Sequence, residues 1–508
     1  MKNFLQSLLR KLLGGNRDGV ANSMPASGRE VGSIKNEPGS PGATDMSLSK
    51  PVEPAPPVEP ARSVESIPGH LSQHPQSNGR SGRIQLIIGL DFGTSFTKVV
   101  IAEQRRAYAV PFDGIPGVGG NPYLLPGFLA IPADGRMQLG TVAGAHHHSG
   151  MKMRILGGDR GRDIRKLATA FVALVFQHAR AWFFQAHGRT YVNHTFDWCV
   201  NVGLPTEHYH DDALMAFYRD IVDAAWAASI RPTALDLEAV DACLDGRQPS
   251  LGREAIGLFP EFVAQVSGYV RTPLRRSDLH LLMDVGAGTV DVAAFNVHKE
   301  DGEDVFPILG KSVENHGVHF LHQHRLTSAG IAPGDPRAPF KGGITDAEVA
   351  RTLGLKLETL KHNDIAFGEH VRDQVSRVVR QARGNYPLSR RWDEGVPFFL
   401  CGGGSRAAFY SALAEQMIAL RNPCRLVQAR LPRPDRLQAD RMTEESYDRI
   451  SVAYGLSFDP LDIGRIIRTD ELPRIDPVVP ERGQCPRCNG TGGLHRPCDR
   501  CGGTGLLG

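Results

Sequence analysis

Two segments that lie far apart in the chain combine residue types suited to phosphate and magnesium. Each carries an aspartate, a glycine-containing turn and a threonine: Asp91-Phe92-Gly93-Thr94-Ser95 and Asp284-Val285-Gly286-Ala287-Gly288-Thr289. The backbone N–H groups of such turns can cradle a polyphosphate, and an aspartate can hold Mg²⁺ through water. Lys98, just beyond the first turn, can place a positive charge on phosphate oxygens. Two such turns facing each other would clamp a nucleoside triphosphate and its metal.

A third turn follows the apolar run over 398–401. Its residues are Gly402-Gly403-Gly404-Ser405, and a helical pattern comes directly after them. Glycine lets the backbone approach a flat group closely. The sequence therefore predicts a contact with adenine or ribose at this turn.

Short apolar runs alternate with helical patterns around these turns. Strands are expected over 84–90, 96–102, 197–204, 279–285 and 290–297. Helices are expected over 161–187, 211–229, 346–383, 405–420 and 443–457. The alternation is typical of α/β proteins, and the length of the segment 84–459 exceeds what one core usually holds. Two α/β lobes are therefore predicted.

In this order, the three turns resemble the two phosphate motifs and the adenosine motif of the actin-like ATPase superfamily, whose lobes are ribonuclease-H-like. Finer likenesses point to the nucleotide-binding domain of the 70-kilodalton heat-shock chaperones. They are Leu125–Ala130, Lys152–Gly157, Val202–Pro205, Phe259–Ala264, Gly317–Phe320 and Ala453–Ser457. The resemblance covers about 84–460 and implies ATP binding between two lobes, hydrolysis and lobe rotation.

The resemblance also implies roles for individual residues. Asp91 and Asp284 would hold the waters of Mg²⁺, and Asp291 would lie in the catalytic metal region. Thr94, Ser95 and Thr289 would contact phosphates, together with Gly93, Gly286 and Gly288, and Gly402, Gly403, Gly404 and Ser405 would contact the nucleoside. Glu261 would position or polarise the attacking water.

Two departures from the chaperones stand out. Gly144 occupies the place expected for their catalytic lysine, so Lys98 is a candidate substitute and hydrolysis is expected to be slow. Their β-sandwich substrate domain and helical lid have no counterpart in the residues after 459.

The C-terminal segment over 485–508 contains two Cys-x-x-Cys hooks. Their four thiols, which suit one tetrahedral Zn²⁺, are Cys485, Cys488, Cys498 and Cys501. So short a segment would fold on its metal. The repeated Cys-x-x-Cys-x-Gly-x-Gly pattern resembles half of the zinc domain of DnaJ-type co-chaperones, which implies contact with clients or a co-chaperone-like partner.

The remaining segments are expected to be tethers. Residues 1–15 form an amphipathic pattern, whose apolar side over 1–13 suits a membrane surface or a docking partner. A disordered Pro/Ser-rich linker is predicted over 16–83, and a second linker is predicted over 460–484.

The chain has 508 residues and a formal net charge of +3, which gives no electrostatic case for nucleic acid. No apolar run is long enough to span a bilayer, and the few cysteines and the lack of an export signal favour the cytoplasm.

The leading hypothesis is an ATP-driven, chaperone-like switch that recruits proteins through its zinc tail or its tether. Three alternatives stay open: an actin-like scaffold or filament anchored by the N-terminal helix, a carbohydrate kinase, and a nucleotide sensor that barely hydrolyses ATP. Lys98 and the basic terminus favour the filament slightly. No carboxylate base facing a sugar hydroxyl could be identified for the kinase.

Overall fold

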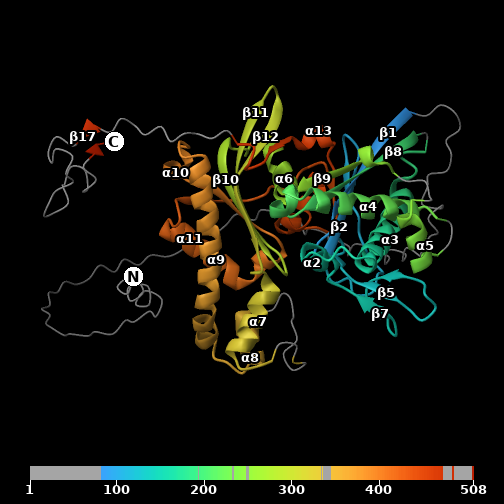
Figure 1. The fold of residues 1–508 in the computed structure, drawn as a ribbon, viewed down its shortest axis with the longest axis horizontal. Helices are drawn as coiled ribbons and strands as arrows, with labels where there is room; N and C mark the ends of the chain where they lie inside the picture. The colour runs from blue at the N-terminus through green and yellow to red at the C-terminus, as the bar shows by residue number, and fades with distance from the viewer. Residues whose placement is uncertain are drawn as a thin grey trace, which may run out of the picture. The chain divides into compact units, whose positions relative to one another are not determined.

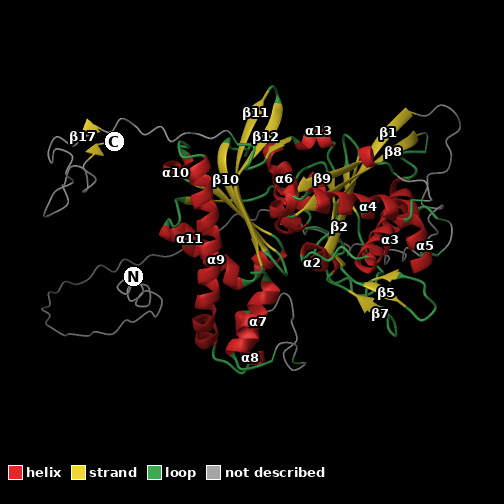
Figure 2. Cartoon of the chain, in the orientation of Figure 1, coloured by secondary structure: helices red, strands yellow, loops and turns green. Residues whose placement is uncertain are grey.

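The computed structural model describes residues 82–472, apart from 193, 232–233, 247–250, 333–334 and 336–344, together with 483–484 and 506–507. The predicted N-terminal helix, nearly all of the first linker and the four cysteines of the tail lie outside the described residues. The described part is mixed α/β (Figures 1 and 2).

The first sheet has the strand order β15-β3-β2-β1-β8-β9, and β4 pairs with β2 at one side. Strand β2 runs antiparallel to both β1 and β3, whereas β8 runs parallel to β1 and β9 runs parallel to β8. The strands are β1 (Gly82–Asp91), β2 (Phe96–Ala102), β3 (Ala107–Ala109), β4 (Leu125–Pro126), β8 (His194–Leu204), β9 (Ile256–Pro260) and β15 (Leu437–Gln438). A small separate sheet contains β5 (Leu129–Ile131), β6 (Gln138–Leu139) and β7 (His146–His148).

The second sheet has the order β14-β13-β10-β11-β12-β16. Its strands are β10 (Asp278–Val285), β11 (Val290–Glu300), β12 (Glu303–Glu314), β13 (Val396–Cys401), β14 (Leu426–Ala429) and β16 (Arg465–Ile467). Here β10, β11 and β12 form an antiparallel meander, while β13 pairs parallel with β10 and β14 with β13. The second sheet therefore repeats the strand order and directions of the first, including an added parallel edge strand.

Each sheet has its own helices (Figure 1). Those that follow strands of the first sheet are α2 (Met151–Leu156), α3 (Arg162–His187), α4 (Asp212–Ser229) and α5 (Leu237–Leu244). Those of the second are α7 (Val318–Ser328), α8 (Asp346–Thr352), α9 (Leu357–Asn385), α10 (Arg391–Glu394) and α11 (Ala408–Leu420). By length and composition α3 could cross a membrane, but most of it is buried in the hydrophobic core beside the first sheet.

A hydrophobic core joins the two sheets. It contains residues of β2 and β11 as well as α6 (Glu261–Ser267) and α12 (Ser451–Leu456). The two helices cross closely, because a Cβ at Gly455 would lie only 1.8 Å from the carbonyl oxygen of Ala264. Only glycine fits at this crossing.

The expected strands are all present, but several expected boundaries differ. The helix expected over 443–457 is a short 3-10 helix, η6 (Glu444–Arg449), followed by α12. The segment over 346–383 forms α8 and α9 instead of one helix, because the chain turns at Gly354, which has a φ of +67°. Gly82 and Arg83, expected in the linker, pair with His194 and Thr195 as the start of β1. Residues 460–467, expected in the second linker, form α13 (Pro460–Ile463) and β16, because Ile463 is fully buried in the core between the sheets.

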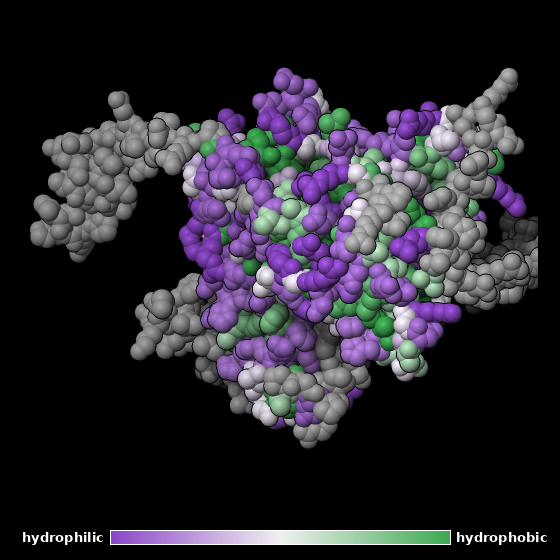
Figure 3. Space-filling model, turned by 45° about the vertical axis from the view of Figure 1, so that its right-hand side comes forward, coloured by the Kyte–Doolittle hydropathy of each residue, from purple (hydrophilic) through white to green (hydrophobic). Residues whose placement is uncertain are grey.

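Charged and polar residues cover most of the face that Figure 3 shows, with small separate apolar areas. Among the described residues, the large apolar side chains that are exposed stand singly along the chain: Val192, Leu274, Leu388, Leu420 and Leu461. Scattered side chains of this kind are normal for a protein surface.

Candidate functional site

The three predicted turns line one cavity of about 870 Å³. This volume lies in the range of small-molecule sites in proteins. The predicted residues on its wall are Asp91, Gly93, Thr94, Ser95, Lys98, Glu261, Asp284, Gly286, Thr289, Asp291, Gly402, Gly403 and Gly404. The other two predicted residues, Gly288 and Ser405, belong to the same turns but do not line the cavity.

The first turn connects β1 and β2, as expected. Asp91 and Lys98 are opposite each other in the antiparallel pair, and the Nζ of Lys98 lies 2.8 Å from Oδ2 of Asp91. A Cβ at Gly93 would lie 2.2 Å from the carbonyl oxygen of Phe96, so the turn requires glycine. In the described part of the chain the amides of Gly93, Thr94 and Ser95 have no hydrogen-bond acceptor. Unused amides in a tight turn are an anion-binding feature.

The second turn connects β10 and β11 and is fastened to the start of α7. The carbonyls of Gly286, Ala287 and Gly288 accept hydrogen bonds from the amides of Val318, His319 and Gly317, at 3.2, 2.8 and 3.1 Å respectively. The carbonyls therefore point toward α7. The amide of Ala287, which lines the cavity, has no acceptor among the described residues, so it remains available to an anion.

The two aspartates of the second hairpin face each other. Asp284 and Asp291 are directly opposite in the β10–β11 register, an arrangement that is unfavourable for like charges. Burial, together with the nearby carboxyl of Glu261, raises the pKa of Asp284 to about 7 and the pKa of Asp291 well above its ordinary value. The Oδ1 of Asp291 is buried and has no hydrogen-bond partner among the described residues. Burial and the neighbouring carboxyls therefore outweigh the effect of the nearby lysines, Lys98 and Lys152, on these pKa values.

The triple-glycine turn packs directly against this hairpin. Cys401, at the end of β13, is in register with Asp284. Gly402 has a φ of +85°, and a Cβ on it would lie 2.0 Å from Oδ1 of Asp284. The chain then enters the short helix η5 (Gly403–Arg406) and α11. The hydroxyl of Ser405 donates a hydrogen bond to the carbonyl of Gly402 at 2.7 Å. This bond holds the serine side chain against the turn and explains why Ser405 does not line the cavity.

Lys152 is the main site residue that the sequence analysis missed. Its Nζ lies 2.5 Å from Oε1 of Glu261, and the residue is only 5% exposed. Burial lowers the pKa of Lys152, but the carboxylate of Glu261 outweighs it and leaves the pKa raised, so the lysine stays charged. Gly144, the position expected for a lysine, is exposed and does not line the cavity. One sequence signal could have identified Lys152. It lies three positions before Ile155, so the two side chains share the buried face of the same helix.

Gln265 also lines the cavity, although the sequence did not predict it. It lies one helical turn after Glu261 on α6, and its amide donates to Oδ2 of Asp284 at 2.9 Å. Its own carbonyl oxygen is buried without a partner among the described residues. Gln265 and Asp291 thus present two unused acceptors at the same cavity.

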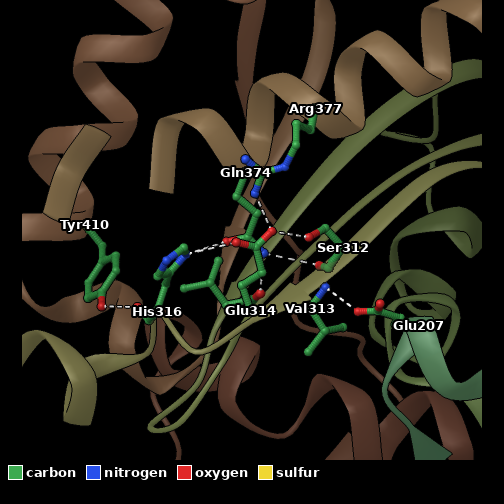
Figure 4. A network of polar contacts seen from close by, with 9 residues as sticks. Glu207, Ser312, Val313, Glu314, His316, Gln374, Arg377 and Tyr410 are labelled. Carbon is green, nitrogen blue, oxygen red and sulfur yellow. Dashed lines mark hydrogen bonds and ion pairs between the residues drawn. The ribbon is translucent and has the colours of Figure 1, made fainter. Parts of the chain in front are cut away.

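A polar network supports the second hairpin from behind (Figure 4). Gln374 on α9 donates to the carbonyl of Val290 at 2.7 Å and to that of Ser312 at 3.3 Å. Val313, the strand partner of Asp291, donates its amide to Glu207 at 2.9 Å. Glu207 belongs to the short helix η2 (Thr206–His210), which follows β8 of the first sheet. The strand beside Asp291 is therefore held by groups from both halves of the structure.

No group of three His, Cys, Asp or Glu residues could hold a metal ion directly within the described part of the chain. The predicted zinc ligands Cys485, Cys488, Cys498 and Cys501 lie outside that part. The segments on either side of them do pair: β17 (Gly483–Gln484) runs antiparallel to β18 (Leu506–Leu507).

No protein-family model matches the chain, and no curated protein matches its sequence. The resemblance to actin-like ATPases therefore rests on the short sequence motifs alone.

Proposed function

We propose that this chain binds and hydrolyses ATP between the two lobes of an actin-like fold and acts as a chaperone-like molecular switch. The observation that carries the proposal is the convergence of three glycine turns, from distant parts of the chain, on one cavity. The repeated order of the two sheets supports the two-lobed fold. Each lobe would then contribute one phosphate hairpin.

The phosphate end of the cavity would be formed by the first two turns. Their unused amides and the hydroxyls of Thr94, Ser95 and Thr289 are donors suited to phosphate oxygens. Gly402, Gly403 and Gly404 would let the nucleoside lie against backbone. The substrate would thus span from the two hairpins to the start of η5.

The acidic residues fit a hydrated magnesium ion. Asp91, Asp284 and Asp291 line the cavity, and the unused oxygens of Asp291 and Gln265 could accept hydrogen bonds from its waters. Burial, followed by the nearby carboxyl of Glu261, raises the pKa values of Asp284 and Asp291, so a bound cation would stabilise their ionised forms. When bound, Mg²⁺ would supply the charge that neutralises the phosphates of the substrate.

Glu261 and Lys152 would serve the attacking water. Glu261 is only partly exposed, and its free oxygen can accept a hydrogen bond from water while Lys152 holds the other oxygen. Lys152 also brings a permanent positive charge to the cavity. Catalysis of phosphoryl transfer depends mainly on such placement of charge and nucleophile. Lys152, beside Lys98, is therefore a second candidate for the role of the lysine expected at Gly144.

The crossing of α6 and α12 is a natural pivot for lobe rotation, because it lies in the core shared by both sheets. The zinc module over 485–508 and the N-terminal segment would recruit clients or a partner, and a cytoplasmic location stays a prediction. Affinity isolation with the Asp284→Asn variant, which is expected not to bind nucleotide, with and without the tail, would test whether partners held in the nucleotide-free state depend on the zinc module.

The proposal is tested by ATP binding and single-turnover hydrolysis with the full chain. We expect wild type to hydrolyse bound ATP in Mg²⁺, and Asp91→Ala, Glu261→Ala and Lys98→Ala to be impaired. Binding without turnover would select the nucleotide sensor, and absence of ATP binding would refute the proposal. Pelleting that depends on ATP would select the filament, and turnover that rises with a sugar and yields a sugar phosphate would select the kinase.

A further inference from the structure

Arg449 lies between the first hairpin and the triple-glycine turn. It belongs to the short helix η6 (Glu444–Arg449), which leads into α12. The centre of its guanidinium is 5.4 Å from the ring centroid of Phe96 on β2. A Cβ on Gly403 would lie 3.1 Å from one terminal nitrogen of the same guanidinium. The side chain therefore reaches across the cavity wall between the two halves of the structure.

The donors of this guanidinium are unused. In the described part of the chain its side chain makes no hydrogen bond or ion pair, and its Nε is buried without an acceptor. The neighbouring Asp448 is already engaged by Arg406, whose terminal nitrogen lies 2.9 Å from Oδ1 of Asp448. Burial, followed by the charge of Arg406, lowers the pKa of Arg449. A half-buried guanidinium with five donors and no acceptor is unfavourable without a ligand.

The position of Arg449 limits what that ligand group can be. The hairpin turns, with Glu261 and Lys152, occupy the end of the cavity suited to the terminal phosphates. The triple-glycine turn occupies the end suited to the nucleoside. Arg449 lies where the first hairpin meets the triple-glycine turn, and the group that joins a nucleoside to its terminal phosphates is the α-phosphate.

We propose that Arg449 binds the α-phosphate of the nucleotide and is a specificity-determining residue that separates nucleotides from nucleosides. The inference rests on the proposed function. A planar guanidinium can donate two parallel hydrogen bonds to a phosphate, which a lysine cannot do. Phe96 would hold the plane of the guanidinium by stacking.

The test compares dissociation constants for ATP, ADP, AMP and adenosine in Mg²⁺ by displacement of a fluorescent ATP analogue from the full chain. Arg449→Gln should weaken ATP, ADP and AMP by a common factor of about 10–100, typical of a lost charge-assisted hydrogen bond, and leave adenosine unchanged. Arg449→Lys should give a smaller common loss. Arg436→Gln is the matched control, because Arg436 also stacks on an aromatic ring, that of Phe458, but does not line the cavity.

Each other outcome overturns the inference in a distinct way. A loss that includes adenosine assigns Arg449 to the nucleoside, and a loss confined to ATP and ADP assigns it to the β-phosphate. Unchanged affinities in both Arg449 variants overturn the inference alone and leave the proposed function intact. If wild type binds none of the four ligands, the proposed function fails, and the inference fails with it. Near-ultraviolet circular dichroism checks that each variant is folded.

Discussion

Replacing Asp284 by asparagine should stabilise the nucleotide-free protein while abolishing nucleotide binding. The pKa of Asp284 rises from 3.8 to about 7, because the carboxyl is buried and lies near Glu261. Above pH 7 the folded protein must therefore hold an ionised carboxylate in an unfavourable place. Since a difference of one in pKa corresponds to about 1.4 kcal/mol, this costs the fold at most about 4 kcal/mol at pH 8.

The sign of the pH dependence follows from the raised pKa. Near pH 3 the carboxyl is largely protonated in both the folded and the unfolded protein, so it costs little. As the pH rises toward 7, the unfolded chain loses this proton first, and wild type loses stability. The advantage of Asp284→Asn should therefore be about 4 kcal/mol at pH 8 and only about 1 kcal/mol at pH 4.5.

The assay is thermal and urea unfolding of the full chain without nucleotide at both pH values, followed by near-ultraviolet circular dichroism. Several degrees of added thermal stability are expected at pH 8. Asp373→Asn is the control, because Asp373 is exposed on α9. A variant no more stable than wild type at pH 8, or equally stabilised at both pH values, would refute the reasoning about burial of this carboxyl.

Four further outcomes are expected. The affinity of wild type for ATP in Mg²⁺ should rise about tenfold from pH 6 to pH 8 as Asp284 ionises, and a flat profile in calorimetry would contradict this. Lys152→Met should cost about 3–5 kcal/mol of stability, because it leaves the Glu261 carboxylate without its partner. The same variant should slow single-turnover hydrolysis at least ~100-fold. A wild-type hydrolysis rate in this variant would remove Lys152 from the mechanism. Gly402→Ala should prevent ATP binding and cost more than about 1 kcal/mol, because its Cβ would meet Asp284, whereas Gly144→Ala, with nothing within 4 Å, should retain binding. Mass spectrometry should find Zn²⁺ bound to wild type and lost in Cys485→Ser.

The two hairpins and the third turn could be predicted because their signals are local. An apolar run, an aspartate and a glycine turn are neighbours in the chain, and alternation along a strand decides which residues reach the turn. The positions of Asp91, Asp284 and Gly402 at the ends of strands follow from this pattern. The boundary at residue 459 was predicted wrongly because this local signal is missing there. The three residues of β16 show too little pattern of their own and form a strand only by pairing with β12.

The sequence by itself determined which short segments could bind phosphate, because the required amides and hydroxyls lie within a few residues of one another. Only the tertiary structure decided which side chains complete the site. Lys152 meets Glu261 across 109 positions of the chain, and Arg449, between β15 and α12, reaches Phe96 from a distant part of the chain. A lysine or arginine in a short helix carries no local sign of its partner, since that contact exists only once the sheets have packed together.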